Sequence, residues 1–207
     1  MDIAGLPGQP LRLLRVQDLR ARVDRDALLR DDTVPEPPYW AHLWPGGRAL
    51  ARLVVASAAE FRGRWVMELG CGLGLPGLAA ARCGARVVLS DRNLETLGYA
   101  RRNLRRNRLA GHVVAMDWDL SAVRGRFSFC LAADVTYDPE SHASLLDFAR
   151  GHLAPTGELW IVESVRAEER ALPASMAGFF EVAETRLPET EEGRRVWVRV
   201  LRGKRRG

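Results

Sequence analysis

Apolar runs and amphipathic stretches alternate along most of the chain, and this alternation predicts strands and helices in turn. The apolar runs predict five strands, at residues 64–69, 85–91, 112–117, 127–134 and 157–165. The stretches between them predict three helices, at residues 76–83, 93–108 and 139–153, the last of them closed by a turn at Pro155–Gly157. Repeated strand–helix units indicate an α/β fold with a parallel sheet, right-handed crossovers and a ligand at the carboxyl ends of the strands.

The C-terminal part of the chain follows a different pattern. A helix predicted over residues 167–179 is broken by Pro173, because proline cannot donate an intrahelical hydrogen bond. Residues 180–188 and 194–202 then alternate apolar and polar positions with a period of two, and an acidic turn joins them. We expect this pair of strands to add antiparallel pairing at one edge of the sheet.

The N-terminal part is less regular, and the stretch "VPEPP" at residues 34–38 marks a joint. We therefore divide the chain into an N-terminal segment, residues 1–37, and one domain, residues 38–207. Substrate recognition by the N-terminal segment is a hypothesis, since no motif in it points to another role. The full length of 207 residues suffices for a single domain with a sizeable core.

The stretch "VMELGCGLGLPGLAA", residues 66–80, raises the question of a cofactor. Its glycines satisfy the dinucleotide pattern G-x-G-x-x-G from Gly72 onward, but the preceding strand ends at Leu69, so the glycine at the turn is Gly70. The pattern E-x-G-x-G-x-G, starting at Glu68, describes the loop better. An acid at the end of the strand would repel a pyrophosphate and suits a ligand with an ammonium and a sulfonium, such as S-adenosylmethionine.

Two further acids favour S-adenosylmethionine over a dinucleotide. Asp91 ends the second predicted strand, at a spacing suited to a ribose diol, as both kinds of cofactor require. Asp117 ends the third strand and is followed by Trp118, so an acid can accept the adenine amino group while an indole covers the ring. The alternative is that these acids are ordinary loop residues and that Trp118 belongs to the core.

The chain resembles the class I, or seven-β-strand, methyltransferases. Within them it is similar to methyltransferase family 16, the protein-lysine methyltransferases that include enzymes acting on the electron-transfer flavoprotein β-subunit and on chaperones. The resemblance starts near Pro38 and is carried by the stretches "WPGGRALARLV", "FRGRWVMELGCGLGLPGLAAARCGARVVLSDRN", "MDWD" and "ADVTYD". It implies a Rossmann-like sheet with strand order 3-2-1-4-5-7-6, strand 7 antiparallel and helices on both faces.

The resemblance also implies roles for single residues. Trp44 would line the cofactor pocket, Asp91 would bind the ribose and Trp118 would flank adenine. Three loop residues would face the methionine part of the cofactor, and Ala133 would contact the cofactor from the end of strand four; the loop residues are Gly70, Cys71 and Gly72. Cys71 is interpreted as a small apolar filler and not as a nucleophile.

The D-x-x-Y signature of the family matches Asp134 and Tyr137, at the rim where the acceptor amine would enter. Asp134 could orient the amine through a hydrogen bond, and Tyr137 could offer its π-face or its hydroxyl. The alternatives are a turn residue at Asp134 and a packing residue at Tyr137. Tyr39 and Trp40 have two equally supported interpretations. They could form an aromatic wall for a substrate, or they could close the core where the chain enters the domain.

Composition and charge limit the kinds of molecule that the protein is expected to bind. The net charge is +5, and the densest basic run, "YARRNLRRNR" at residues 99–108, is more typical of a solvated helix face than of a phosphate-binding one. No N/D-P-P-Y/W motif follows strand four, so nucleic acid is not the expected substrate. No apolar run approaches about 18 residues, so no membrane span is expected. Three cysteines and four histidines show neither disulfide nor metal-ligand spacing, which favours a reducing cytoplasm and no metal.

These observations leave three hypotheses for function. The first is an S-adenosylmethionine-dependent N-methyltransferase that methylates a lysine side chain of a protein, acting as a monomer. The second is a small-molecule N-methyltransferase on an amine or pyridine, because the same fold and rim could serve a free amine. The third is a cofactor-binding module without catalysis, and the presence of all four acids argues against it: Glu68, Asp91, Asp117 and Asp134.

Overall fold

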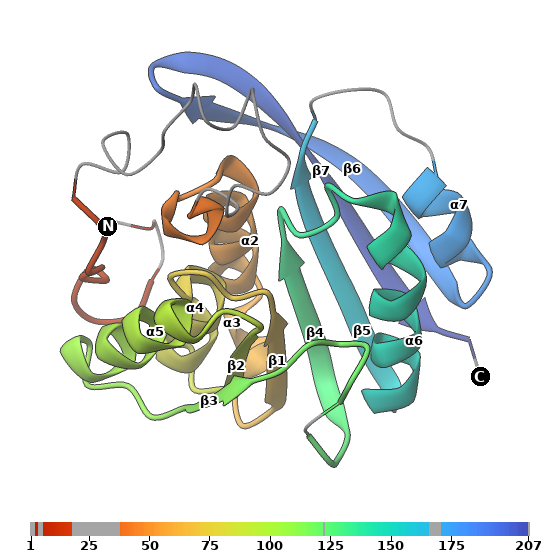
Figure 1. Ribbon diagram of the computed structural model, residues 1–207, viewed down its shortest axis with the longest axis horizontal. Helices are drawn as coiled ribbons and strands as arrows, with labels where there is room; N and C mark the ends of the chain where they lie inside the picture. Colours follow the sequence, from red (N-terminus) through yellow and green to blue (C-terminus); the bar gives the residue numbers. More distant parts are fainter. Residues whose placement is uncertain (1–2, 4–5, 18–37, 122, 166–170, 207) are drawn as a thin grey trace, which may run out of the picture.

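The computed structural model describes residues 3, 6–17, 38–121, 123–165 and 171–206. Its centre is one seven-stranded sheet with the order β3-β2-β1-β4-β5-β7-β6 (Figure 1), as the sequence resemblance implied. Strand β7 pairs antiparallel with both of its neighbours, and the other adjacent pairs are parallel. The strands are β1 Trp65–Leu69, β2 Arg86–Asp91, β3 His112–Ala115, β4 Phe127–Ala133, β5 Leu153–Ser164, β6 Phe180–Glu191 and β7 Arg194–Arg205.

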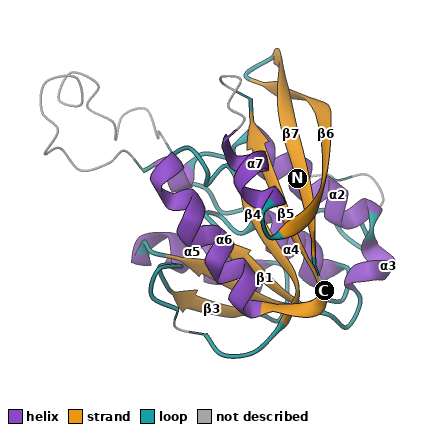
Figure 2. Ribbon diagram, turned by 90° about the vertical axis from the view of Figure 1, so that its right-hand side faces the viewer, coloured by secondary structure: helices purple, strands orange, loops and turns teal. Residues whose placement is uncertain are grey.

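Helices cover both faces of this sheet (Figure 2). Buried side chains of α2 to α5 form one apolar cluster with one face of the sheet, and those of α6 and α7 form a second cluster with the other face. The helical elements are η2 Tyr39–Ala41, α2 Pro45–Ala56, α3 Ala58–Phe61, α4 Leu75–Arg82, α5 Leu94–Arg106, η3 Pro139–Ser141, α6 His142–His152 and α7 Ala171–Ala177. This is the doubly covered α/β architecture that the pattern predicted.

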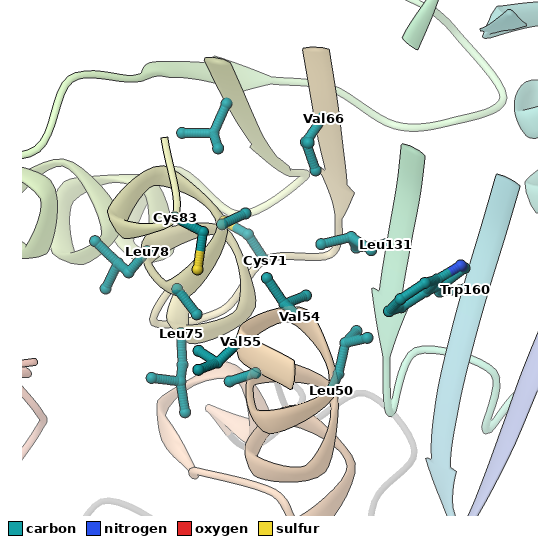
Figure 3. Packing of buried hydrophobic residues seen from close by; sticks show 14 of the residues in the cluster. Leu50, Val54, Val55, Val66, Cys71, Leu75, Leu78, Cys83, Leu131 and Trp160 are labelled. Atoms are coloured by element: carbon teal, nitrogen blue, oxygen red, sulfur yellow. The ribbon is translucent and has the colours of Figure 1, made fainter. Parts of the chain in front are cut away.

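Aromatic packing fixes α2 and α3 against the middle of the sheet. The rings of Phe61 and Phe129 stack with centroids 4.2 Å apart, and Trp160 meets both rings edge to face. Figure 3 shows Trp160 beside Leu50 and Val54 of α2 in the same cluster. Because α2 begins immediately after Trp44, this packing also positions the aromatic segment that precedes the helix.

Two predicted details of the chain path differ in the structure. The turn expected at Pro155–Gly157 is absent, because α6 ends at His152 and β5 begins at the next residue. The pairing of β4 with β5 shifts register between Phe127 and Phe129, so the extra residues form an irregularity inside the ladder. Pro173 does not break α7, since it lies in the first turn, where an N–H has no intrahelical acceptor. Residues 167–170 of that predicted helix lie outside the described residues.

The described part of the N-terminal segment packs on the domain. Ile3 and Leu11 are buried in the cluster that α2 and α4 build, and the Arg82 side chain donates to the carbonyl oxygen of Gln9 at 2.8 Å. Ile3 and Leu11 therefore belong to the core of the domain. Residues 18–37 lie outside the described part, and substrate recognition by the N-terminal segment stays a prediction.

Candidate active site

A cavity of about 760 Å³ lies at the carboxyl ends of the central strands. It is lined by residues that follow β1, β2, β3 and β4 and by the segment that leads into α2. Every residue predicted for the site lines this one cavity: Trp44, Glu68, Gly70, Cys71, Gly72, Asp91, Asp117, Trp118, Ala133, Asp134 and Tyr137. The topology of the sheet brings them together, since carboxyl ends of parallel strands meet at one edge.

The glycine loop begins directly after β1, as predicted. Gly70 and Gly72 have positive φ angles of 59° and 51°, which a side chain would strain. A Cβ on Gly70 would lie 2.5 Å from Val135, and a Cβ on Gly72 would lie 3.1 Å from the carbonyl oxygen of Trp40. The loop therefore needs glycine both for its conformation and for the close approach of two neighbouring segments.

Glu68 lies at the end of β1, as the sequence indicated, but its side chain is buried and hydrogen-bonded within the protein. It is the penultimate residue of β1, only 2% exposed, and its Oε2 accepts a hydrogen bond from the N–H of Gly77 at 2.8 Å. Burial raises the pKa of Glu68 to about 8, although the Gly77 hydrogen bond opposes this shift. The side chain thus ties β1 to the first turn of α4, and contact with a cofactor stays a prediction.

Asp91 ends β2 and organises the loop opposite it. Its Oδ2 accepts a hydrogen bond from the N–H of Gly72 at 3.1 Å, and its Oδ1 accepts one from the N–H of Asn93 at 3.0 Å. Burial raises the pKa of Asp91, and the two main-chain donors counteract that shift. The carboxylate is thereby fixed beside the glycine loop, where a ribose diol would meet it.

The residues after β3 form the far side of the cavity. Asp117 accepts a hydrogen bond from the N–H of Asp119 at 3.3 Å and forms a bridge with Leu120, so it belongs to a tight turn. Trp118 lines the cavity and also packs on the second apolar cluster. Both interpretations of Trp118 are therefore compatible with the structure, since the residue contacts the core and also lines the cavity.

Aromatic residues ahead of α2 cover the cavity. The Trp40 ring lies 5.2 Å from that of Tyr99 on α5, and the Trp44 indole N–H donates to the carbonyl oxygen of Tyr39 at 2.9 Å. His42 packs edge-on against Trp44 and approaches Glu191 of β6 at 3.3 Å. Tyr39 and Trp40 thus line the cavity, which favours a wall over simple closure of the core.

The predicted acceptor end lies after β4. Asp134 has a positive φ of 53°, which aspartate tolerates better than most residues, and its Oδ1 accepts a hydrogen bond from the N–H of Ser164 at 2.6 Å. Its Oδ2 lies against Gly46 in the first turn of α2. Tyr137 is 65% exposed at the rim. The D-x-x-Y pair therefore combines an anchored carboxylate with an exposed ring.

A buried polar network that the sequence did not reveal supports this rim. Thr136 donates its hydroxyl to Glu163, and the Arg199 guanidinium donates to the same carboxylate, with Nε at 2.6 Å. His142 bonds the carbonyl oxygen of Thr136 at 2.9 Å. These contacts join the loop after β4, which carries Tyr137, to β5, β7 and α6. No local pattern could have indicated the contacts of Glu163 with Thr136 and Arg199, because their partners are 27 and 36 positions apart in the sequence.

Cysteine and metal chemistry find no support in the described residues. Cys71 is 5% exposed, and burial, followed by the nearby charges of Glu68 and Asp91, raises the pKa of its thiol well above its usual value. A protonated, buried thiol acts as a small apolar residue. The described residues include no group of three His, Cys, Asp or Glu side chains placed to hold a metal ion.

The cavity fits S-adenosylmethionine. Gly70 and Gly72 bring the main chain of the loop to the cavity, Asp91 offers a fixed carboxylate, and Trp118 offers an aromatic face. A seven-stranded sheet of this order with such a cavity defines a Rossmann-like, class I methyltransferase. S-adenosylmethionine is the methyl donor of this class.

Comparison with known proteins identifies the family. The sequence matches the methyltransferase small domain family over residues 40–190, and the chain belongs to that family. It is 31% identical to the histone-arginine methyltransferase METTL23 of Homo sapiens over 146 residues, which cover 64% of this chain and 75% of that protein. It is 35% identical to the electron transfer flavoprotein beta subunit lysine methyltransferase of Mus musculus over 109 residues, covering 52% of this chain and 43% of that protein.

A solved structure shows the same fold. Magnesium protoporphyrin IX methyltransferase from Synechocystis PCC 6803, determined with bound S-adenosylmethionine, superposes with a TM-score of 0.63. Its sequence is 19% identical, and the match covers 77% of this chain and 78% of the other. The predicted methyltransferase family, fold and cofactor are therefore confirmed.

Proposed function

We propose that this methyltransferase transfers a methyl group to the terminal nitrogen of a lysine side chain in a protein. The observation that carries the proposal is the D-x-x-Y rim, where the anchored carboxylate of Asp134 and the exposed ring of Tyr137 line the same cavity as the cofactor loop. A long, thin side chain suits such a rim. The lysine methyltransferase activity named for one relative also supports the proposal.

The residues of the rim would prepare the amine for transfer. A lysine ammonium has an ordinary pKa of about 10.4 and must lose a proton before its lone pair can attack. The bound cofactor supplies a methyl group on a sulfonium, from which transfer is an in-line displacement. Asp134 would attract the incoming amine and hold it in line, and Tyr137 would present a π-face beside it. Exclusion of water by the aromatic segment around Trp40 would lower the pKa of the amine by desolvation.

Two other acceptors remain as specific alternatives. One relative is named as a histone-arginine methyltransferase, so an arginine guanidinium is the second candidate. A free small-molecule amine is the third, since Tyr137 leaves the rim accessible. The cytoplasmic location and the monomeric state stay predictions; three buried free cysteines support a reducing compartment. Among the described residues no helix combines the length and apolar character needed to cross a bilayer.

The test is transfer of labelled methyl from S-adenosylmethionine into a cell lysate that is then separated into protein, RNA and small-molecule fractions. We expect label in protein, and methyl-lysine after hydrolysis of the labelled band. Detection of methylarginine instead of methyl-lysine would show that the acceptor is arginine. Label found only in the small-molecule fraction would overturn the proposal of a protein substrate.

Asp134→Asn is the matched variant, because asparagine can still accept the Ser164 hydrogen bond through its Oδ1. It should retain binding of S-adenosylhomocysteine and lose at least about 100-fold in transfer rate. Tyr137→Phe keeps the ring and should lose less. A wild-type rate in Asp134→Asn would show that the acceptor site lies elsewhere, with Tyr39 and Trp40 as the next candidates.

A further inference from the structure

Two asparagines at α5 have no role in the site described above. Asn103 is fully buried on a face of α5 that otherwise carries Ala100 and Leu104, and Asn107, which is 9% exposed, caps the C-terminal end of that helix. A buried amide is costly unless its oxygen and nitrogen both find partners. The partners of these two amides are therefore informative.

Both asparagines bind the main chain of the N-terminal segment. The Oδ1 atom of Asn107 accepts a hydrogen bond from the N–H of Arg12 at 2.8 Å, and its Nδ2 donates one to the carbonyl oxygen of Arg12 at 2.9 Å. The Oδ1 atom of Asn103 accepts a hydrogen bond from the N–H of Leu14 at 2.6 Å, and its Nδ2 donates one to the carbonyl oxygen of Leu14 at 3.3 Å. Each amide thus pairs with both main-chain groups of one residue. The reverse orientation of either amide would place its NH₂ against an N–H, so this network also fixes the assignment of oxygen and nitrogen.

The spacing of the pair matches an extended peptide. Residues four apart on a helix are separated by about 6 Å along its axis, and alternate residues of an extended chain by about 6.6 Å. Asn107 pairs with the earlier residue and Asn103 with the later one, so the segment runs antiparallel to α5 and its later residues approach the end of the helix beside the cavity. Leu11, which is fully buried, anchors it.

Asn103 makes one bond that Asn107 lacks. Its Nδ2 also donates to the carbonyl oxygen of Leu73 at 3.0 Å, and Leu73 lies in the glycine loop and lines the cavity. Asn107 uses its second N–H within α5, on the carbonyl oxygen of Asn103. One amide therefore connects the N-terminal segment, α5 and the cofactor loop.

We propose that Asn103 and Asn107 form a clamp for extended peptide main chain, that residues 11–14 of this chain occupy it, and that its occupancy raises the affinity for the cofactor. The clamp orients Asn103, and Asn103 holds Leu73 in the conformation that the cofactor needs. Because linkage is reciprocal, cofactor binding must in turn stabilise the clamped segment by the same factor. Asn103 is a positioning residue, which acts on the cofactor through the loop.

The first experiment removes a main-chain donor and leaves the cavity unchanged. Arg12→Pro lacks the N–H that Asn107 accepts, and Arg12→Ala, its control, keeps that N–H; the Arg12 side chain is exposed in either case. Proline also favours an extended conformation for the residue before it, which suits the clamped path. In calorimetric titrations of the full chain, Arg12→Pro should raise the Kd for S-adenosylhomocysteine about 5-fold and Arg12→Ala should leave it unchanged.

The second experiment compares the two asparagines. Asn103→Ala should raise the Kd for S-adenosylhomocysteine at least about 10-fold, and Asn107→Ala should raise it less, because only Asn103 touches the glycine loop. A merely structural pair would lower the stability of both variants and leave both Kd values at the wild-type level. That outcome would overturn the proposal.

Amide hydrogen exchange supplies the reciprocal measurement on the wild-type chain. Saturating S-adenosylhomocysteine should slow exchange at Leu14 as well as in the glycine loop. Slowing confined to the loop would refute the coupling, even if a variant of Asn103 fails to fold. None of these measurements involves a methyl acceptor, so their failure is distinguishable from a failure of the proposed lysine specificity.

Discussion

Three carboxylates of the cavity bind main-chain N–H groups: Glu68 binds that of Gly77, Asp91 those of Gly72 and Asn93, and Asp134 that of Ser164. Each acid therefore fixes a neighbouring segment before any ligand is bound. Preorganised acids of this kind lose little entropy when a ligand arrives, which makes their removal costly for binding as well as for the local structure.

Asp91→Ala should weaken binding of S-adenosylhomocysteine by about 1–3 kcal/mol, because the ribose hydroxyls lose their acceptor and Gly72 loses a loop contact. Calorimetry of the folded variant measures the change. Asp119→Ala is the control, since Asp119 is an exposed acid at the same cavity and should leave the affinity unchanged. Equal affinities of wild type and Asp91→Ala would remove Asp91 from the cofactor site.

Glu68 should make the stability of the cofactor-free chain depend on pH. Its folded pKa is raised to about 8 by burial, above the ordinary value of 4.5. The folded state therefore holds a proton that the unfolded state releases between these values, and stability falls as the pH rises from about 4.5 through 8. Glu68→Gln keeps an acceptor for Gly77 and should flatten this fall by at least about 1 kcal/mol between pH 5 and 8. Parallel profiles of the two chains in urea unfolding would contradict this assignment.

The sequence indicated where the site residues lie but could not indicate their partners. The end of each parallel strand is readable from apolar runs, and this placed Asp91, Trp118 and Asp134 at one edge. The hydrogen bond from Ser164 to Asp134 depends on the register of β4 against β5, which no local pattern encodes. Asn103 and Asn107 did carry a signal, since two amides four residues apart interrupt the buried face of an amphipathic helix.

At the scale of the elements, the β6–β7 hairpin extends over to α2 (Figure 1). Its strands end in a two-residue turn, Glu192–Gly193, in which both φ angles are positive, as tight hairpins favour. Near this turn Glu189 is 8% exposed and forms ion pairs with Arg48 and Arg52 of α2. The hairpin thus braces the helix whose first turn supports the acceptor end of the cavity.

Glu189→Gln should destabilise the chain by about 1–3 kcal/mol, because two guanidinium groups of α2 would face each other without a carboxylate. Burial and the charge of Arg48 lower the pKa of Arg52, so the two guanidinium groups repel each other. Glu184→Gln is the control on the same strand: its pair with Arg186 is exposed and 4.0 Å apart, and it should cost less than about 0.5 kcal/mol. Urea unfolding measures both; equal costs would show that the brace contributes nothing.

Periodicity predicted the type and order of the strands and the main helices, because each buries one face or one stripe. Periodicity gave wrong predictions where the effect of a residue depends on its position within a helix or a strand. Proline interrupts a helix only beyond its first turn. The effect of Pro173 could therefore not be predicted without knowing where α7 begins. Pro155 and Gly157 favour a turn, but the structure places them in the irregular start of β5, between Leu153 and Glu158, which both pair with β4.

At the scale of the whole molecule, the charge of the cavity is opposite in sign to the net charge of the chain. The net charge of the chain is +5, yet the described residues that line the cavity include seven carboxylates besides the protonated Glu68, and one arginine, Arg92. A cavity with this excess of acid concentrates cations and disfavours anions. It therefore suits a cofactor with an ammonium and a sulfonium, together with an incoming amine, and it opposes the pyrophosphate of a dinucleotide.

This distribution predicts which ligands stabilise the fold. A ligand that binds only the folded chain raises its free energy of unfolding by about 2.7 kcal/mol when present at 100 times its Kd. S-adenosylmethionine and S-adenosylhomocysteine should both produce this shift in urea unfolding, whereas NAD at equal concentration should produce none. Relative to its own ligand-free stability, Asp91→Ala should need a correspondingly higher ligand concentration for the same shift, because the substitution raises the Kd. Stabilisation by NAD equal to that by S-adenosylhomocysteine would mean that the cavity does not select by charge, and the acids around it would then need another explanation.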